Sequence, residues 1–396
     1  LEVEATLLRL AVANGIPGPA VGYVLQPDDG LGSGFIMDWL EGETLGQRIN
    51  RSEQFSEVRA GLARECGRIL GRIHALPWRE AKLDEALPVV DPATLVDETW
   101  EIYRALDIPV PMLDFTRAWL LDNLPADSRR TLVHGDFRNG NLMISPAGIE
   151  AVLDWELAHI GDPVRDLGWL CVNSWRFGKR ELPVGGFGEV ADLLDGYRET
   201  SGVDVSLDAL HFWEVFGSFW WGAVTLQMAN AWRLGATPSL ERPVIGRRSS
   251  EAQMDCVNLL IPGSFDLPDL QRPLHEGSQL PMPAELIEGV VGFLGREVAP
   301  ALADRSAFLA RVAANSLQIA QRELRFGGEL NAAESARLIT LLQSGEQDLD
   351  SLRRELVDRL RDGRTLDRDA LAAHLRQTVA GQLAIDQPKY SALRGA

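Results

Sequence analysis

Cysteine is scarce in this 396-residue sequence, and long apolar runs are absent. The three cysteines, Cys66, Cys171 and Cys256, are scattered and odd in number. They argue against a disulfide framework or a zinc site and suit a reducing cytoplasm. No stretch of about 18 uncharged apolar residues occurs, so no transmembrane helix is expected. No signal-peptide pattern is visible, but the chain opens with Leu1 rather than Met, so this observation adds little to the expectation of a cytoplasmic protein.

Basic residues are also in short supply. Lys and Arg total 39 against 57 Asp and Glu, which gives a formal net charge of -18. This excess of negative charge disfavours nucleic acid as a partner. It would suit a cationic small molecule, although high net charge serves solubility equally well. The length fits two or three domains, and the apolar fraction of 45% is that of a globular protein.

Residues 260–283 lack any periodic pattern and hold five prolines, so we interpret them as a linker. Beyond this linker, residues 284–396 are rich in Ala, Leu, Arg and Glu. Their short connections predict an antiparallel helical bundle. Its helices are expected at 284–302, 305–326, 331–344, 346–362 and 367–384.

Before the linker, helices and short strands alternate. Apolar periodicity predicts helices at 2–13, 57–76, 189–200 and 208–234, and at 93–124 with a break around Pro109 and Pro111. Strands are expected within 16–42, at Thr131–Val133, at Leu142–Ile144 and over the segment IEAVLDW that begins at Ile149. The strand Gly34–Leu40 is a short apolar run, which predicts that it is buried.

The segment LVHGDFRNGNLMI, from Leu132 to Ile144, carries the most informative polar residues. Asp136 is followed five residues later by Asn141, and Asp154 ends the next strand. Phosphoryl transfer needs an acceptor that orients and deprotonates the attacking hydroxyl, together with oxygen ligands that hold magnesium on the phosphates. An Asp, an Asn five residues later and a second Asp match the catalytic-loop pattern of kinases.

Taken together, these motifs closely resemble the aminoglycoside phosphotransferase family. They are His134-Gly135-Asp136, Asn141, LDWE (153–156) and GDPVRDLGWL (161–170). The longer run GDPVRDLGWLCVNSWRFG is most similar to the branch related to acyl-CoA dehydrogenase-associated kinases. The resemblance covers residues 1–255. It implies an α+β, protein-kinase-like fold with an incomplete N-lobe and a mainly helical C-lobe, followed here by an all-α helical bundle.

By this resemblance, Asp136 is the catalytic base, and Asn141 and Asp154 are ligands of Mg2+. Arg138 lies two residues beyond the base, and we expect it to stabilise charge on the transferred phosphate. It could equally be solvated or paired with Asp162. His134 is expected to be a structural, hydrogen-bonding histidine. Asp162 and Asp166 are expected to brace the loop and cap the next helix.

The resemblance also implies how ATP would bind. It divides the first part of the chain into a partial N-lobe, 1–42, and a C-lobe, 43–259. Glu4 occupies the place of the helix glutamate that pairs with the family's ATP-binding lysine. The strand GFIMDWLEG resembles the hinge between the lobes, where backbone groups around Asp38, Trp39 and Leu40 would meet adenine; a plain core strand is the alternative.

The family's strand lysine and nucleotide-covering loop are missing from the sequence. The first lysine of this sequence is Lys82, which lies well past the hinge. No Gly-rich loop precedes Glu4. The lysine normally pairs the phosphates. We therefore expect that the first strands of the small lobe lie outside this chain, and that the chain by itself binds ATP poorly and has little kinase activity.

The sequence thus predicts an ATP-dependent phosphotransferase that acts on a hydroxyl of a small molecule, with a hydroxyacyl-CoA or a related metabolite as acceptor. One alternative is an aminoglycoside phosphotransferase, which the acidity would suit. Another is a non-catalytic pseudokinase scaffold that binds protein partners through its bundle. A protein kinase is disfavoured because no activation segment ending in A-P-E follows Asp154.

The helical region 284–396 resembles an uncharacterised domain that is often attached to such kinases. The segments RVAANSLQIAQREL (Arg311–Leu324) and LAIDQPKY (Leu383–Tyr390) carry this likeness. Several polar residues on adjacent helical turns could form a groove for a phosphate or acyl carrier, or simply an exposed helix face. These residues are Arg311, Asn315, Gln318, Arg322 and Arg325. A protein-interaction or regulatory module is expected, without a metal site.

Overall fold

The computed structural model describes residues 1–235, 238–272 and 281–393. These residues form two compact units. One comprises 1–97 and 120–217, and the other comprises 98–119 and 218–396 apart from the undescribed residues. The domain boundaries expected from the sequence stay predictions. No helix among the described residues is long and apolar enough to cross a membrane.

The first unit begins with α1 (Glu2–Ala13), which was predicted, and with the antiparallel strands β1 (Val21–Val24) and β2 (Phe35–Met37). The prediction that the Gly34–Leu40 strand is buried is wrong. The side chain of Ile36 is 58% exposed and that of Trp39 is 91% exposed. In the described part of the chain β2 pairs only with β1, and a two-stranded sheet leaves much of its surface to solvent.

Two further antiparallel pairs support the central loop. Strand β3 (Thr131–Val133) pairs with β6 (His159–Gly161), and β4 (Leu142–Ser145) pairs with β5 (Gly148–Val152). The sequence predicted β3, β4 and β5. It missed β6, because His-Ile-Gly is too short to show an alternating pattern. The segment between β3 and β4 is therefore anchored at both ends by different strand pairs.

The remaining helices of this region are, in chain order, α2 (Gly46–Arg51), α3 (Ser56–His74), α4 (Pro92–Arg104), α5 (Pro111–Asp122), α6 (Val164–Cys171), α7 (Val190–Ser201), α8 (Leu207–Arg233), α9 (Glu241–Arg247) and α10 (Ser249–Leu260). Among them, α3, α4, α5, α7 and α8 match the sequence periodicity, including the break near Pro109 and Pro111, whereas α2, α6, α9 and α10 were not predicted. Helices α3 and α7 pack closely because glycines line their contact: a Cβ on Gly67 would lie 2.1 Å from the Leu193 oxygen.

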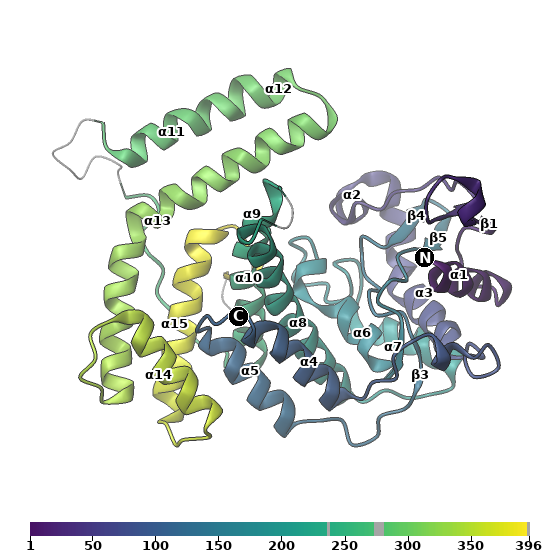
Figure 1. Ribbon diagram of the computed structural model, residues 1–396, viewed down its shortest axis with the longest axis horizontal. Coiled ribbons are helices and arrows are strands. Elements are labelled where there is room, and N and C mark those ends of the chain that lie inside the picture. Colours follow the sequence, from purple (N-terminus) through teal and green to yellow (C-terminus); the bar gives the residue numbers. More distant parts are fainter. Residues whose placement is uncertain (236–237, 273–280, 394–396) are drawn as a thin grey trace. The chain divides into compact units, whose positions relative to one another are not determined.

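The C-terminal region is helical, as predicted, but its longest helix was not foreseen. Its helices are α11 (Pro283–Phe293), α12 (Ala299–Ala301), α13 (Asp304–Leu342), α14 (Leu349–Arg361) and α15 (Arg368–Asp386), with a π-helical turn at Leu294–Val298 between the first two. The break expected between 326 and 331 is wrong: α13 continues through Gly327 and Gly328, and its ribbon changes direction along its length (Figure 1). Phe326 and Leu330 pack in a small apolar cluster with Ile319 and Ile385, and this packing outweighs the helix cost of glycine.

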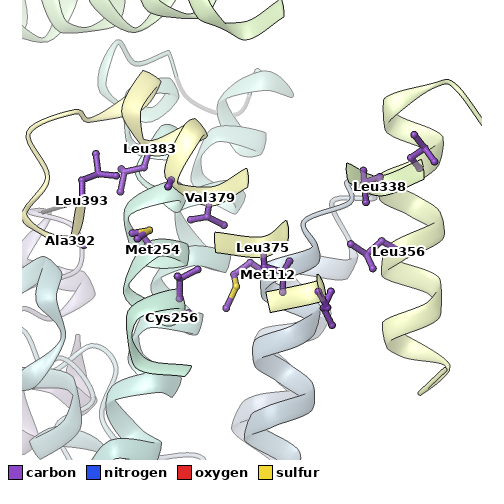
Figure 2. Packing of buried hydrophobic residues seen from close by; sticks show 14 of the residues in the cluster. Met112, Met254, Cys256, Leu338, Leu356, Leu375, Val379, Leu383, Ala392 and Leu393 are labelled. Carbon is purple, nitrogen blue, oxygen red and sulfur yellow. The ribbon is translucent and has the colours of Figure 1, made fainter. Parts of the chain in front are cut away.

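The larger apolar core of the second unit draws on several helices (Figure 2). Met112 of α5 and Met254 of α10 lie in the same cluster as Leu338 of α13, Leu356 of α14 and Leu375 of α15. Full burial of a side chain of this size contributes about 1.5–3 kcal/mol. The last helices are therefore part of a core that α5 and α10 also build.

Two arginines that were expected to line a polar groove instead form hydrogen bonds to the backbone. Arg322 donates to the backbone oxygens of Ile385 and Asp386, and Arg325 donates to that of Arg272. They fix neighbouring backbone segments, so they do not line an open groove. Arg311, by contrast, is exposed.

Candidate active site

The loop between β3 and β4 is held by a buried carboxylate. Asp166 of α6 accepts the backbone N–H of His134 on Oδ2 and that of Gly135 on Oδ1, both at 2.8 Å. Gly135 has φ of +85°, and a Cβ there would lie 2.3 Å from the Leu157 oxygen, so glycine is required. The expectation that Asp166 braces this loop is confirmed.

Asp166 stays ionised although it is fully buried. Burial alone raises its pKa, but the hydrogen bond from His74 and the nearby charge of Arg165 outweigh it and lower the pKa to about 2. His74 Nε2 lies 3.1 Å from Asp166 Oδ2, and its Nδ1 lies 3.1 Å from the Tyr197 hydroxyl. Helices α3, α6 and α7 thus all contribute to the support of the loop.

His134 is a structural residue, as predicted. Its Nδ1 accepts the backbone N–H of Asp136 at 3.2 Å, and its Nε2 lies 3.1 Å from the Leu153 oxygen. These two partners require the neutral ring with its proton on Nε2. Burial lowers the pKa of His134, which favours the same neutral form. The ring therefore connects the loop to the end of the β5 strand.

The Asp136 carboxylate is held by three donors. Its Oδ1 accepts Arg138 Nε at 2.9 Å and Trp169 Nε1 at 2.7 Å. Its Oδ2 accepts Asn141 Nδ2 at 2.6 Å. Because each carboxylate oxygen has two lone pairs, Oδ1 is fully used and Oδ2 retains one lone pair. The group is oriented, buried on one side and still able to accept one further hydrogen bond.

Arg138 pairs with Asp136, so the expected alternatives of a solvated side chain or a pair with Asp162 are wrong. Its guanidinium lies 4.4 Å from the ring centre of Trp175, and its side chain is 24% exposed. Asp162 instead accepts the backbone N–H of Val164 at 2.9 Å, next to the start of α6, whose N-cap residue is Pro163.

Asn141 and Asp154 are brought together through the backbone. The Leu153 N–H donates to the backbone carbonyl oxygen of Asn141 at 2.9 Å. Asp154 therefore directly follows a residue that is paired with Asn141. Asp154 is exposed and has φ of +64°, an unusual value for a residue other than glycine. Since Asn141 uses its amide nitrogen on Asp136, its side-chain oxygen is the atom that remains for another ligand.

Glu4 of α1 belongs to the same neighbourhood. Burial raises its pKa, the chain's amino terminus lowers it, and the charges of Asp154 and Glu156 raise it further. These carboxylates therefore lie within electrostatic reach of one another. In the ranges that the structure covers, no ion pair joins Glu4 to a basic side chain, and Lys82 pairs with Glu85 at 3.7 Å.

This donor set fits a magnesium ion that also has phosphate ligands. Oxygens of Asn141 and Asp154 are of the type that Mg2+ prefers, and a cation would relieve the mutual repulsion of Asp154, Glu156 and Glu4. Among the described residues, no group of three or more His, Cys, Asp or Glu side chains could hold a metal ion by itself. A cation bound here would need further ligands, which nucleotide phosphates provide.

The residues expected near adenine follow β2. The Asp38 N–H donates to the Ala20 oxygen at 3.0 Å, Trp39 is almost fully exposed, and Leu40 is half-buried. Their contact with a nucleotide stays a prediction.

Sequence reasoning missed Trp169, Trp175 and His74 as supports of this loop. Trp169 lies within the quoted GDPVRDLGWL motif, yet nothing local in that motif indicates that its indole reaches Asp136. His74 ends an amphipathic helix, where a polar residue ordinarily faces solvent. Only the packing of α3 against α6 and β3 and the tertiary hydrogen bond from Trp169 to Asp136 reveal these contacts.

A mixed helix–strand fold with a catalytic-loop Asp, an Asn five residues later and a mainly helical continuation defines a kinase-like phosphotransferase. Residues 1–203, about half of the chain, match the model of the Phosphotransferase enzyme family (APH). The chain belongs to this family. Residues 300–390 match a domain of unknown function (DUF6285).

Among curated relatives, mouse acyl-CoA dehydrogenase family member 10 is 30% identical over 177 residues, which cover 43% of this chain and 16% of that protein. Mouse acyl-CoA dehydrogenase family member 11 is 30% identical over 179 residues, covering 41% of this chain and 23% of the relative. The matched stretch thus spans less than a quarter of either relative's length.

A solved structure from Ralstonia eutropha, provisionally described as an aminoglycoside phosphotransferase, superposes with a TM-score of 0.56. Its sequence is 20% identical, and the match covers 64% of this chain and 81% of that one. At this identity the likeness shows the fold alone. It confirms the kinase-like fold class predicted from the sequence.

Proposed function

We propose that this chain carries the catalytic loop of an enzyme that transfers the γ-phosphoryl group of ATP to a hydroxyl group of a small molecule, with Asp136 as the general base, and that the chain by itself has little of this activity. The observation that carries the proposal is the Asp136 carboxylate, which Arg138, Asn141 and Trp169 orient while one lone pair of Oδ2 stays available. Membership of the phosphotransferase family supports the same reaction class.

In this reaction the acceptor hydroxyl donates its hydrogen bond to Asp136 Oδ2. Its oxygen forms the new bond to the γ-phosphorus while the bond from that phosphorus to the β–γ bridging oxygen breaks. The hydroxyl proton passes to Oδ2, and ADP leaves with the electron pair of the broken bond. The fixed carboxylate supplies positioning, which is the main task of the protein in phosphoryl transfer.

Arg138 is suited to stabilise the charge on the transferred group. Its Nε holds Asp136, whereas its Nη1 and Nη2 make no hydrogen bond to the described residues. These two nitrogens can therefore donate to phosphate oxygens without release of the base. The ring of Trp175 beneath the guanidinium keeps its plane in place.

Magnesium, when bound, neutralises negative charge on the phosphates. Asn141, through its side-chain oxygen, and Asp154 are the residues proposed to hold it. We assign Glu4 to the nucleotide phosphate region because of its proximity to Asp154, and the backbone of Asp38, Trp39 and Leu40 to adenine.

The proposed acceptor is a hydroxyacyl-CoA or a related hydroxylated metabolite, and the proposed compartment is the cytoplasm. Support for the choice of acceptor comes from the stretch matched with relatives that are named for acyl-CoA dehydrogenation. The formal charge of -18 favours a cationic acceptor such as an aminoglycoside instead, which makes the choice a direct experimental comparison. Purified protein is incubated with ATP, Mg2+ and each acceptor, and mass spectrometry detects the gain of one phosphoryl group.

The decisive variant is Asp136→Asn, assayed in this chain and in the longest reading frame that contains it. Loss of the base is expected to lower kcat by about a hundredfold or more. Asp84→Asn, a change at an exposed aspartate outside the site, serves as the matched control and should keep full activity. Undiminished transfer by the Asp136→Asn protein, with folding unchanged, would contradict the role of the base.

A further inference from the structure

A cavity in the second unit lies outside the site described above. It has a volume of about 620 Å³ and is bordered by the last turns of α13 and the first turns of α15. Small or apolar side chains form much of its wall, namely Ala336, Leu341, Ala370 and Ala373. The polar wall consists of Arg337, His374, Thr340, Gln343 and Asp367. The Asp367 carboxylate accepts the Ala370 N–H at 2.9 Å as the cap of α15. Leu338 and Leu375, the residues that follow Arg337 and His374, belong to the core in Figure 2.

His374 is the unusual member of this wall. Its side chain is 2% exposed, and neither ring nitrogen has a hydrogen-bond partner in the described part of the chain. Buried polar atoms are almost always bonded, so both nitrogens require an explanation. Burial lowers the pKa of His374 to about 4, with Arg337 and Arg353 lowering it and Glu334 raising it. The ring is therefore neutral at neutral pH and offers one donor and one acceptor.

Arg337 provides a positive charge beside this ring. Its Nη2 donates to Thr378 Oγ1 at 3.1 Å, but its buried Nε has no partner among the described residues. Burial lowers the pKa of Arg337, and Glu334 is the charge that opposes this effect.

Glu334 is already committed to a different arginine. Its two oxygens accept Arg353 Nε at 2.8 Å and Arg353 Nη2 at 2.6 Å, a bidentate pair. One carboxylate therefore serves two arginines, and within the described ranges Arg337 forms no ion pair of its own. A negatively charged ligand would supply a counter-ion.

We propose that this cavity binds a small organic carboxylate, whose charged head pairs with Arg337 and accepts a hydrogen bond from His374. Its short apolar chain lies against Ala336, Ala370 and Ala373, whose methyl groups leave the space for it. The site is separate from Asp136, so its occupation does not depend on the proposed phosphotransfer.

The chemistry of the wall separates this ligand from other small molecules. A cation would be repelled by Arg337 and attracted only by Asp367, which already accepts the Ala370 N–H, and a neutral alcohol would leave the guanidinium without a counter-ion. Inorganic phosphate would satisfy the charge but not the apolar surface. Water alone could bond to the nitrogens of His374 without balancing the charge of Arg337.

The test follows the histidine ring signals by NMR in the full 396-residue protein at neutral pH. Butyrate is the probe, and butan-1-ol, butylamine and inorganic phosphate are the comparison compounds. The spectrum of His374→Gln identifies the His374 signal. Butyrate is expected to shift this signal saturably, whereas butan-1-ol and butylamine are expected to leave it in place.

Two variants locate the binding. Arg337→Gln should weaken butyrate binding about tenfold, because a charge-assisted hydrogen bond is lost. Ala373→Leu fills the cavity from its exposed side and should abolish saturation. The matched controls are Arg311→Gln and Ala333→Leu, which alter exposed α13 residues outside the cavity wall and should bind normally.

A His374 signal that does not respond to butyrate would mean that the cavity holds water only and would overturn the proposal. Equal affinity for phosphate and butyrate would contradict the proposed contact of the ligand with the apolar wall. Normal butyrate binding by Ala373→Leu would show that butyrate binds somewhere else. Because Ala373 is exposed, this variant tests the proposal even if Arg337→Gln fails to fold.

Discussion

The indole of Trp169 donates its Nε1–H to Oδ1 of Asp136 at 2.7 Å. Arg138 uses the same oxygen, so the two donors together leave Oδ1 with no free lone pair. The lone pair available for an incoming proton is therefore on Oδ2, beside Asn141. If Asp136 is the base, as we propose, Trp169 is a positioning residue, because it acts on the orientation of that carboxylate without touching the reacting atoms.

Replacement of Trp169 by phenylalanine keeps a ring in the buried position and removes the N–H. The carboxylate can then rotate about its bond to Cβ. We expect kcat to fall about tenfold. The lost hydrogen bond contributes about 1 kcal/mol or slightly more, and without it the carboxylate is less often in the orientation needed for the reaction. The KM for ATP should stay unchanged, because Trp169 does not lie among the residues proposed to hold nucleotide.

Trp232→Phe is the matched control for this prediction, since that indole is 43% exposed and lies far along α8. Equal losses of activity in both variants would point to a general effect of tryptophan removal. A fall in kcat/KM caused only by a raised KM for ATP would contradict a role in orientation of the base.

Acid should weaken the fold through Asp166. Its pKa of about 2 lies below the ordinary value of 3.8, so the ionised carboxylate stabilises the folded state at pH above 3.8. This contribution, on the order of 2 kcal/mol, is lost as the pH falls from 3.8 towards 2. Urea unfolding at a series of pH values should show this loss in the native protein.

Asp166→Asn should be less stable at pH 7 and should lack this part of the pH dependence. The amide can accept from only one of the two backbone N–H groups that the carboxylate holds, and it leaves a buried donor unpaired. A variant whose stability falls between pH 4 and 2 as steeply as that of the native protein would disprove the assignment.

The catalytic loop illustrates what sequence can and cannot indicate. Asp136 and Asn141 were predicted together because their five-residue spacing matches the catalytic-loop pattern of kinases, and the structure joins them by a hydrogen bond. Trp169 and His74 were missed because their contacts join residues 33 and 92 positions apart. Such contacts depend on tertiary packing, such as that of α3 against α6 and β3, and a single sequence does not encode that packing as a local pattern.

Helix α3 allows a matched test of that packing. A Cβ at Gly67 would lie 2.1 Å from the Leu193 oxygen of α7, whereas a Cβ at Gly61 would meet nothing within 4 Å. Gly67→Ala should therefore force the helices apart and destabilise the protein by about 1–3 kcal/mol. Gly61→Ala should instead stabilise it by up to about 1 kcal/mol, because alanine is the better helix former.

Chemical unfolding of both variants measures this difference directly. Comparable changes in the free energy of unfolding, in either direction, would show that the close approach of α3 and α7 is absent in solution. The pair also controls for helix propensity, since both substitutions are in the same helix.

The continuity of α13 provides the remaining prediction. The sequence predicted a break between 326 and 331, but Phe326 and Leu330 pack on either side of the two glycines there, and the helix continues. Gly328 is exposed and has open space around its Cβ position, so Gly328→Ala should stabilise the protein by up to about 1 kcal/mol. Gly328→Pro should cost about 3 kcal/mol or more, because proline removes a backbone hydrogen bond and clashes with the preceding turn. A loop at this position would tolerate proline and gain little from alanine, so near-equal unfolding midpoints for the two variants would show that the break predicted from the sequence exists after all.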